Sequence, residues 1–393
     1  MTNHAYILSA VRTPSGNLLG SLSSLSAHDL GAIAIRAALE RSGVANKAVK
    51  EVIMGCVLQA GQGQAPARQA ALSAGLSQSV PCTTLNKMCG SGMRAVMMLA
   101  DSMMAERMDC GIAGGMESMS NAPYLLPDIR QGKKFGNMRL FDHLFRDGLQ
   151  DAYKHELMGY YAQETADECG IDRQQMDAFA LLSLKRALAV QKNGLDTLEV
   201  VPVNVKDKYG DVIQIEHDEQ PSKVDLEKIP YLKPAFTKEG TITAANSSSI
   251  SDGASALVLG SERYVQKTRR EPLARIVDYV SYARDPERFT LAPIGAIEAL
   301  LKRLNWRIDE VDLFEINEAF AVVTLACAQA LDISLEKINV TGGACAIGHP
   351  IGSSGSRVIT TLVHNMRRLS VKKGIAAVCI GGGEATAIAL TVD

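Results

Sequence analysis

The order of apolar and polar positions predicts alternating buried strands and amphipathic helices in the first part of the chain. The run 6–11 indicates a short buried strand, and apolar residues recur on one helical face over 30–41, until Gly43 ends the pattern. A second strand is predicted over 52–57, followed by a helix around 68–72, a break at Pro81 and a long helix over 92–106. This alternation favours a mostly parallel sheet with helices on both faces.

The residue composition changes between about residues 121 and 245, where charged residues, prolines and glycines are frequent. This pattern predicts an inserted, loop-rich subdomain, although 176–191 keeps helical periodicity. Beyond Asp252 the apolar pattern returns and continues to the C-terminus. We therefore expect an N-terminal half (1–120), an inserted subdomain for ligand binding and oligomer contacts (121–248), a return segment of the first half (249–271) and a C-terminal half (272–393).

Two pairs of segments suggest an internal duplication. Residues 92–96 resemble 355–359, and residues 112–117 resemble 379–384, in the same order and at a similar spacing. Chance matching of short glycine-rich words is the alternative explanation. We favour an α/β fold of two related halves, with the active site where their loops meet.

Composition narrows the class of protein. The 393 residues are 47% hydrophobic but only 5% aromatic, which is typical of a compact α/β enzyme with an aliphatic core, and the length suggests two or three domains. The net charge of −2 gives no general attraction to nucleic acid or to membranes. Residues 1–8 lack a signal-peptide pattern, and we expect an unexported, cytoplasmic chain. The eight cysteines form no CxxC pair, which indicates free thiols in a reducing compartment.

Cys89 lies among small residues directly before the long helix predicted over 92–106. The amides and positive dipole end of that helix would favour the thiolate, so we expect Cys89 to be the most reactive thiol. The adjacent glycines leave backbone N–H groups free for an oxyanion. The same stretch, 90–95, also fits the dinucleotide pattern GxGxxG/A, but the acid at the required distance, Asp109, precedes the next strand instead of ending it.

His349 lies between Gly348 and Pro350 in a glycine-rich stretch, which is unsuited to an ordinary helix-face residue. A general base beside a thiol is its expected role. Cys345, four residues earlier, raises the alternative of a metal site, but the glycine and proline interrupt the helix and no further ligands fall nearby.

Two more segments carry polar groups. Cys379 ends an apolar run and is followed by three glycines whose N–H groups could bind an anion, although a buried structural cysteine is the simpler interpretation. The segment 315–320, Glu-Ile-Asn-Glu-Ala-Phe, would by itself be interpreted as a capped helix start.

Taken together, five motifs resemble the thiolase family in order and along the whole chain: Cys-Gly-Ser-Gly at 89–92, Gly-Gly-Met-Glu-Ser at 114–118, Asn-Glu-Ala-Phe at 317–320, Gly-His-Pro-Ile-Gly at 348–352 and Cys-Ile-Gly-Gly-Gly at 379–383. The resemblance implies a fold of duplicated α/β halves, with mixed sheets covered by helices.

The resemblance also implies roles for individual residues. Cys89 becomes acylated and His349 activates it. Cys379 exchanges the α-proton of the second substrate. Asn317 holds a water that completes one oxyanion site with His349, and the N–H groups of Cys89 and Gly381 form the other.

The resemblance extends to the substrate pocket. The loop 246–253 resembles the family's pantetheine-binding loop, with Ser248 as the matching serine. Other positions that match or adjoin the family's acyl and pantetheine pocket are Leu157, Met158, Phe236, Ala245, Ala319 and Phe320. Leu157 replaces a histidine common in bacterial biosynthetic members, and an arginine often placed against the adenine is absent around 220–222. The basic group Arg130, Lys133, Lys134 and Arg139 is either a solvated face or an attraction for CoA phosphates.

The reaction that the resemblance implies is the reversible Claisen condensation of two acetyl-CoA molecules to acetoacetyl-CoA and CoA, through acetyl-Cys89. CoA is then substrate and product, so no cofactor or metal is expected, and a homotetramer is the implied assembly. The Cys-Gly-Ser-Gly form and the bulky Met88, Met158, Phe289 and Phe320 favour short acyl chains. Alternatives are a broader-range 3-ketoacyl-CoA thiolase, a decarboxylating ketoacyl synthase, against which Cys379 speaks, and a catalytically silent scaffold or lipid carrier.

Overall fold

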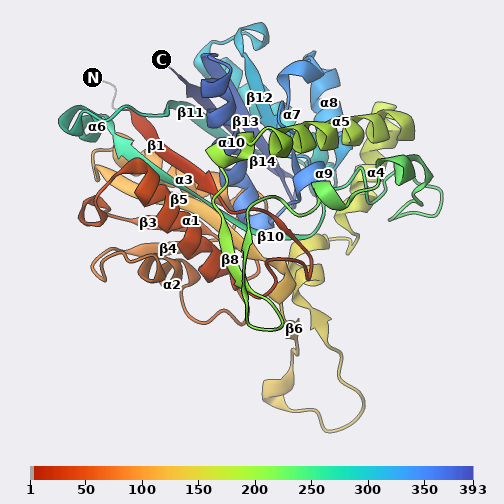
Figure 1. Cartoon of the computed structure of the whole chain (residues 1–393). Coiled ribbons are helices and arrows are strands. Elements are labelled where there is room, and N and C mark those ends of the chain that lie inside the picture. The colour runs from red at the N-terminus through yellow and green to blue at the C-terminus, as the bar shows by residue number, and fades with distance from the viewer. Residues whose placement is uncertain (1–3, 393) are drawn as a thin grey trace.

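Strands from both ends of the chain join in one ten-stranded sheet in the computed structural model, which describes residues 4–392 (Figure 1). Residues 1–3, at the start for which no signal peptide is expected, lie outside the described range. The spatial order is β12 (Leu313–Ile316), β13 (Lys373–Ile380), β14 (Glu384–Thr391), β11 (Ala274–Ala283), β1 (Ala5–Arg12), β10 (Ser251–Ser261), β5 (Cys110–Ser118), β3 (Val52–Gly55) and β4 (Cys82–Leu85), with β2 (Gly16–Asn17) paired to β10.

The direction of the strands corrects the expectation of a mostly parallel sheet. Only β3–β4, β3–β5 and β12–β13 pair in parallel, and the pairs between β5 and β13 that run through the middle of the sheet are antiparallel. Helical crossovers produce parallel neighbours, as in the unit from β3 through β5. The glycine turn 381–383 instead makes β13 and β14 a hairpin, with Ile380 opposite Glu384.

Helices form three layers around the two halves of this sheet. The long helices that contain the matching segments 92–96 and 355–359, α3 (Ser91–Met104) and α10 (Ile351–Arg368), pack against each other and against strands of both halves. One outer layer contains α1 (Ala27–Ser42) and α2 (Pro66–Ser73), and the other contains α7 (Ala292–Leu304) and α8 (Ala321–Leu331). The predicted α/β fold with two related halves is confirmed, and the three main apolar clusters fill the spaces between these layers.

Local sequence signals determine the ends of α1. Ser26 accepts a hydrogen bond from the N–H of Asp29, whose side chain accepts from the N–H of Ser26, and Gly43 ends the helix with φ 61°. Such caps satisfy backbone groups that a helix end leaves unpaired. By contrast, the acid-rich segment expected to start a helix at 315 first completes β12, and α8 begins only at Ala321 without a side-chain cap.

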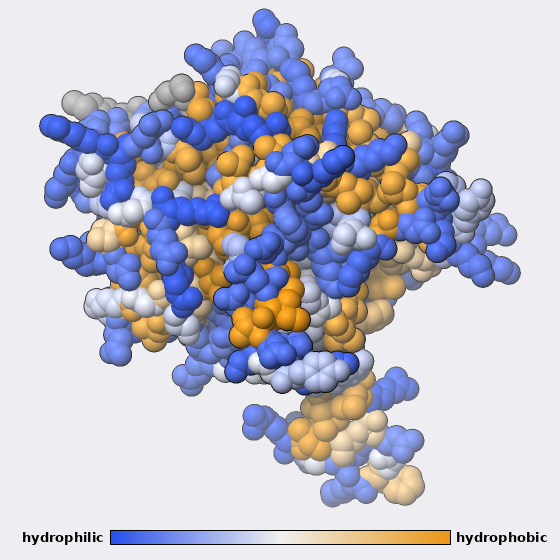
Figure 2. Space-filling model, viewed as in Figure 1, coloured by the Kyte–Doolittle hydropathy of each residue, from blue (hydrophilic) through white to orange (hydrophobic). Residues whose placement is uncertain are grey.

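The segment between β5 and β10 contains two helices, α4 (Met158–Cys169) and α5 (Arg173–Lys192), which pack against α8 and α9 (Ala344–Ile347). It also contains the two-stranded ribbons β6–β7 (Tyr124–Leu125, Phe141–Asp142) and β8–β9 (Val203–Lys206, Val212–Ile215). After β10, the short α6 (Glu262–Thr268) leads to β11. The residues between β6 and β7 project from the body of the molecule, and apolar side chains show on their surface (Figure 2).

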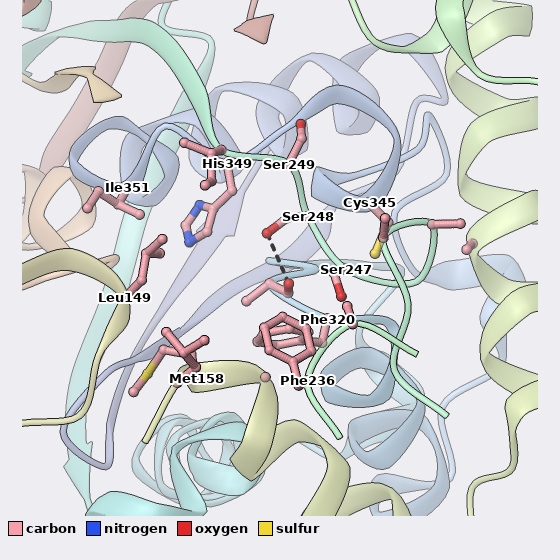
Figure 3. Close-up of a pocket in the computed structure, with 18 of the residues that line it drawn as sticks. Leu149, Met158, Phe236, Ser247, Ser248, Ser249, Phe320, Cys345, His349 and Ile351 are labelled. Atoms are coloured by element: carbon pink, nitrogen blue, oxygen red, sulfur yellow. Dashed lines mark hydrogen bonds between the residues drawn. The ribbon is translucent and has the colours of Figure 1, made fainter. Parts of the chain in front are cut away.

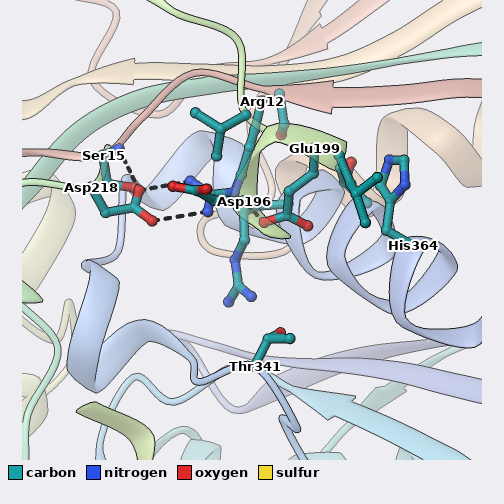
Figure 4. Close-up of polar contacts among 12 residues, drawn as sticks. Arg12, Ser15, Asp196, Glu199, Asp218, Thr341 and His364 are labelled. Atoms are coloured by element: carbon teal, nitrogen blue, oxygen red, sulfur yellow. Dashed lines mark hydrogen bonds and ion pairs between the residues drawn. The ribbon is translucent and has the colours of Figure 1, made fainter. Parts of the chain in front are cut away.

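A buried ion cluster ties this segment to the first strand (Figure 4). Arg12, at the end of β1, donates from Nε to Glu199 at 2.6 Å and from its two Nη atoms to Asp218 at 2.7 and 2.9 Å. The Asp218 carboxylate also accepts from the N–H of Ser15 at 2.8 Å. The planar guanidinium satisfies both carboxylates at once, so the segment is held at two points. Across the described range, every helix is too short or too polar to span a bilayer.

Candidate active site

A cavity of about 690 Å³ opens between loops of both halves and the segment 145–250. Ten of the residues predicted for the site line it: Cys89, Leu157, Met158, Phe236, Ala245, Ser248, Ala319, Phe320, His349 and Gly381. Met88 and Phe289, expected near the acyl end, line it as well. The other two predicted residues, Asn317 and Cys379, have no exposed surface and lie in the buried layer next to the cavity. The structure therefore gathers the separate sequence motifs into one region.

Cys89 lies in the loop between β4 and α3, two residues before the helix begins. Burial raises the pKa of the Cys89 thiol to about 11, and hydrogen bonds from the N–H groups of Gly381 and of Cys89 itself offset only part of that rise. This corrects the expectation that the helix start lowers the pKa, because desolvation of the thiolate outweighs the nearby amides. The resting nucleophile is a thiol and requires a base.

His349 enters the cavity from the turn between α9 and α10 (Figure 3). Its backbone N–H donates to Ser249 at 3.1 Å, and its Nδ1 lies 2.5 Å from the Ser354 hydroxyl. That hydroxyl donates to the Pro350 carbonyl at 3.0 Å, so its oxygen accepts from Nδ1–H. Nε2 is thereby the unprotonated ring nitrogen, which can accept a proton. Burial, helped by the charge of Arg357, lowers the pKa of His349 to about 3, which keeps the ring neutral.

Asn317 directly follows β12, and Cys379 lies near the carboxyl end of the neighbouring parallel strand β13, so the two residues meet at one edge of the sheet. The Asn317 N–H donates to the Ala377 carbonyl at 2.9 Å, and its side-chain nitrogen lies 3.5 Å from Nε2 of His349. Burial, with the nearby Cys89 and Cys327, raises the pKa of Cys379 well above the ordinary value for a thiol. The resting site thus contains two protonated thiols and a neutral imidazole.

Glu117, within the Gly-Gly-Met-Glu-Ser motif, hydrogen-bonds to the backbone of two segments next to the cavity. Its carboxylate accepts N–H bonds from Val57 at 2.9 Å, Leu58 at 3.0 Å and Gly352 at 2.9 Å. Burial raises its pKa to about 7 despite these bonds. Glu117 thus joins the turn after β3 to the first turn of α10, which follows His349. The motif is visible in the sequence, but its long-range partners are not.

The cavity wall is apolar around the reacting groups. The rings of Phe236 and Phe320 meet edge to face at 6.0 Å, and Met158, Leu149 and Ile351 lie beside His349 (Figure 3). The Ser248 hydroxyl donates to the Ala319 carbonyl at 2.9 Å, which leaves its oxygen able to accept from a ligand. Sequence reasoning missed Leu149 and Phe145, because they lie in a π-helical turn, Leu144–Leu149, within the segment that carries no clear apolar period.

The two alternative sites suggested by the sequence, a dinucleotide site with Asp109 and a metal site with Cys345 and His349, can be compared with the observed contacts. Asp109 accepts from Arg263 and Ser261 at the start of β5, so it is not available to hold a ribose near residue 90. The Cys345 thiol donates to the Glu318 carbonyl at 3.6 Å, while His349 uses Nδ1 toward Ser354. Within residues 4–392, no group of three or more histidine, cysteine or acidic side chains could hold a metal ion.

Other polar groups lie around residues 220–222, where the arginine that often contacts the adenine in the family is absent. Gln220 and Lys223 line the outer cavity; the Gln220 amide donates to the Cys345 carbonyl at 3.0 Å, and Lys223 pairs with Glu219. The basic group at 130–139 lies in the projecting segment and is exposed. Among these cationic side chains, Lys223 is the one that lines the cavity.

Comparison with known proteins agrees with this geometry. The family model described as "Thiolase, N-terminal domain" matches residues 5–263, and "Thiolase, C-terminal domain" matches residues 270–392. The chain is 48% identical to a probable acetyl-CoA acetyltransferase of Dictyostelium discoideum, over 98% of this chain and 93% of that one. It is 46% identical to an acetyl-CoA acetyltransferase of Schizosaccharomyces pombe, over 99% of both. The Acat5 thiolase of Ascaris suum, solved in complex with coenzyme A, superposes with a TM-score of 0.93 at 42% identity, over 99% of both chains.

Proposed function

The chain belongs to the thiolase family, and from that premise we propose that it has acetyl-CoA C-acetyltransferase activity. It joins two acetyl-CoA molecules to acetoacetyl-CoA and CoA, and it catalyses the reverse thiolysis. The observation that carries the proposal is the convergence of a thiol, a neutral imidazole and two backbone donors on one cavity, with a second thiol and an amide directly behind them. Covalent acyl transfer needs the first set, and carbon–carbon bond formation needs the second.

In the first half-reaction, His349 Nε2 takes the proton of the Cys89 thiol as sulfur attacks the acetyl carbonyl of acetyl-CoA. The N–H groups of Cys89 and Gly381, which hydrogen-bond to the Cys89 sulfur in the resting site, then donate to the oxyanion that forms beside it. The bond from carbon to the CoA sulfur then breaks, and the departing CoA thiolate takes the proton of Cys379. The products are acetyl-Cys89 and CoA, with a thiolate at Cys379 and an imidazolium at His349 that balance in charge.

In the second half-reaction, a second acetyl-CoA enters and the Cys379 thiolate removes a proton from its α-carbon. The enolate oxygen is stabilised by His349 and by a water held at Asn317. The carbanion attacks the carbonyl of acetyl-Cys89, a carbon–carbon bond forms and the bond to the Cys89 sulfur breaks. The Cys89 thiolate recovers its proton from the His349 imidazolium, which returns every group to its starting state.

The test is thiolysis of acetoacetyl-CoA by the purified protein with added CoA, followed as loss of the enolate absorbance. We expect turnover by the wild type and none by Cys89→Ser, which keeps the size of the side chain but lacks the thiol nucleophile. Absence of turnover by the wild type, together with release of carbon dioxide from a malonyl thioester, would replace the proposal with a decarboxylating synthase.

We also propose that CoA serves only as substrate and product, with no resident cofactor or metal, and that the protein is cytoplasmic. The eight free cysteines support a reducing compartment. A fluorescent fusion that accumulates in an organelle would contradict the location. Activity that survives dialysis against a chelator is expected if no metal takes part.

We propose a homotetramer in which the projecting segment between β6 and β7 helps dimers to pair. Its Phe135 is 95% exposed and its Leu140 65% exposed, next to Lys133 and Lys134. Exposed apolar groups of this size are typical of surfaces that another chain covers. Sedimentation velocity at micromolar protein should show a tetramer, and Phe135→Ser should shift the population toward dimers. A wild-type monomer would contradict the proposal.

A further inference from the structure

Arg357, in the second turn of α10, is buried beside the reacting groups with 3% of its surface exposed. Its guanidinium donates from Nη1 to the Glu315 carboxylate at 2.8 Å and from Nη2 to the side-chain oxygen of Asn317 at 3.2 Å. Both acceptors come from the end of β12, where Glu315 is 1% exposed and Asn317 is fully buried. The Arg357 guanidinium therefore binds one side chain within β12 and one directly after it.

The bond to Asn317 decides which way its amide faces. An amide side chain presents an acceptor at one end and a donor at the other, and rotation about its last bond exchanges the two. Because Arg357 has only donors, it selects the orientation in which Oδ1 faces α10. The Asn317 nitrogen then faces His349, 3.5 Å from Nε2. The reversed amide would place an acceptor where the second half-reaction needs a donor.

We propose that Arg357 is a positioning residue for carbon–carbon bond formation, which holds the Asn317 amide with its donor toward His349 and the water beside it. This inference rests on the proposed function. Acyl transfer to Cys89 uses His349, the proton of Cys379 and the N–H groups of Cys89 and Gly381, but not the Asn317 amide. Stabilisation of the enolate oxygen relies on His349 and Asn317. Loss of the paired hydrogen bonds from the Arg357 guanidinium to Glu315 and Asn317 should therefore impair the second half-reaction selectively.

The experiment compares two assays on the intact enzyme. Exchange of labelled CoA into acetyl-CoA reports acylation of Cys89 alone, and thiolysis of acetoacetyl-CoA requires both halves. For Arg357→Met we expect kcat of thiolysis to fall about 10²-fold, the usual cost of a lost oxyanion donor, with KM and the exchange rate within about threefold of wild type. Arg357→Lys keeps a charge but lacks the fork, and should lose about tenfold in thiolysis with the exchange rate retained.

Coupling to Asn317 supplies the decisive comparison. Asn317→Ala should show the same selective loss, and the double variant Asn317→Ala/Arg357→Met should be no slower than Asn317→Ala alone, because Arg357 acts through that amide. Glu315→Gln keeps an oxygen acceptor for Arg357 and should retain most activity. Should Arg357→Met not fold, Arg357→Lys carries the same comparison.

Two results would overturn the inference. Equal loss of exchange and thiolysis in the Arg357 variants would assign Arg357 to the stability of the whole site. Multiplication of the two single effects in the double variant would show that it acts independently of Asn317. An inactive wild type in both assays would instead refute the proposed function, so the two failures are distinguishable.

Discussion

Gly92 and Gly355 face each other where α3 and α10 cross. A Cβ on Gly92 would lie 2.6 Å from the backbone nitrogen of Ser356, and a Cβ on Gly355 would lie 2.4 Å from that of Met93. The two glycines belong to the matching segments 92–96 and 355–359, so the contact is reciprocal between the halves. Because Cys89 precedes α3 and His349 precedes α10, this close crossing brings the nucleophile and the base to one cavity.

Gly355→Ala should destabilise the protein by about 3 kcal/mol or more, because the added methyl meets backbone atoms that cannot move independently. The matched control is Gly148→Ala, whose methyl meets the side chains of Ile351 and Leu58 at 3.4 and 3.5 Å, an ordinary contact distance. Chemical denaturation of both variants measures the difference. Equal stability of the two would show that the helices separate without cost.

Alkylation of Cys89 by iodoacetamide should accelerate about tenfold per pH unit between pH 7 and 9, because its pKa of about 11 leaves the thiolate a minor species throughout that range. Peptide mapping after timed quenching measures the rate at each cysteine. Prior incubation with acetyl-CoA should protect Cys89 but not the half-buried Cys169. A rate that levels off below pH 8 would mean that the thiolate already predominates near neutral pH.

Cys379→Ser should block condensation and thiolysis far more than acylation, because removal of the α-proton requires the Cys379 thiolate, whereas the departing CoA thiolate can take its proton from the His349 imidazolium instead. Incubation with acetyl-CoA should still leave one acetyl group on Cys89, visible by intact mass. Cys327→Ala, at a neighbouring buried thiol outside the cavity, should keep both half-reactions. If the Cys379 variant does not acylate, proton donation from Cys379 to the departing CoA is indispensable, and the selective effect on the second half-reaction is contradicted.

His349 should make the protein sensitive to acid. The unfolded chain binds a proton at this histidine near pH 6.5, whereas the folded protein binds it only near pH 3. Between these values the unfolded state holds more protons, so this contribution to stability falls as the pH falls. Relative to His349→Gln, wild type should lose about 1.4 kcal/mol per pH unit from pH 6 to 4. Urea unfolding at each pH measures the free energy of unfolding of both proteins, and the exposed His155→Gln serves as the control. If the difference in unfolding free energy between wild type and His349→Gln did not change with pH, the buried histidine would not be neutral as described.

Thiolysis of four-carbon ketoacyl-CoA should exceed that of ten-carbon substrate in kcat/KM by more than about tenfold. Each methylene that fits contributes only about 1 kcal/mol of attraction, so a preference for short chains requires a steric wall. Met158 is placed to form it, because a Cβ on Gly381 would lie 3.5 Å from its sulfur. Met158→Ala should narrow the preference, and Met138→Ala, in the projecting segment, should not. Equal values for both substrates in wild type would remove the short-chain assignment.

The family, the approximate helices and the residues that line or adjoin the cavity could all be predicted from the order of amino acids. These conclusions rest on information carried by neighbouring residues: Ser26 and Gly43 limit α1 through local hydrogen bonds and a left-handed turn, and the motifs around Cys89 and His349 are short and ordered. Local periodicity also predicted the helices at 68–72 and 176–191, which the structure extends by a few residues.

The strand directions, the ionisation of the site and the residues that orient its side chains could be established only from the folded chain. Strand direction depends on where a distant strand such as β10 pairs, which no local period records. The pKa of Cys89 depends on how completely the folded chain excludes water, and that exclusion exceeds the effect of its own helix. Arg357 meets Asn317 across 40 positions of sequence, because β12 and α10 pack in three dimensions. Burial and long-range contact are properties of the assembled core, so a linear pattern of residues cannot specify them.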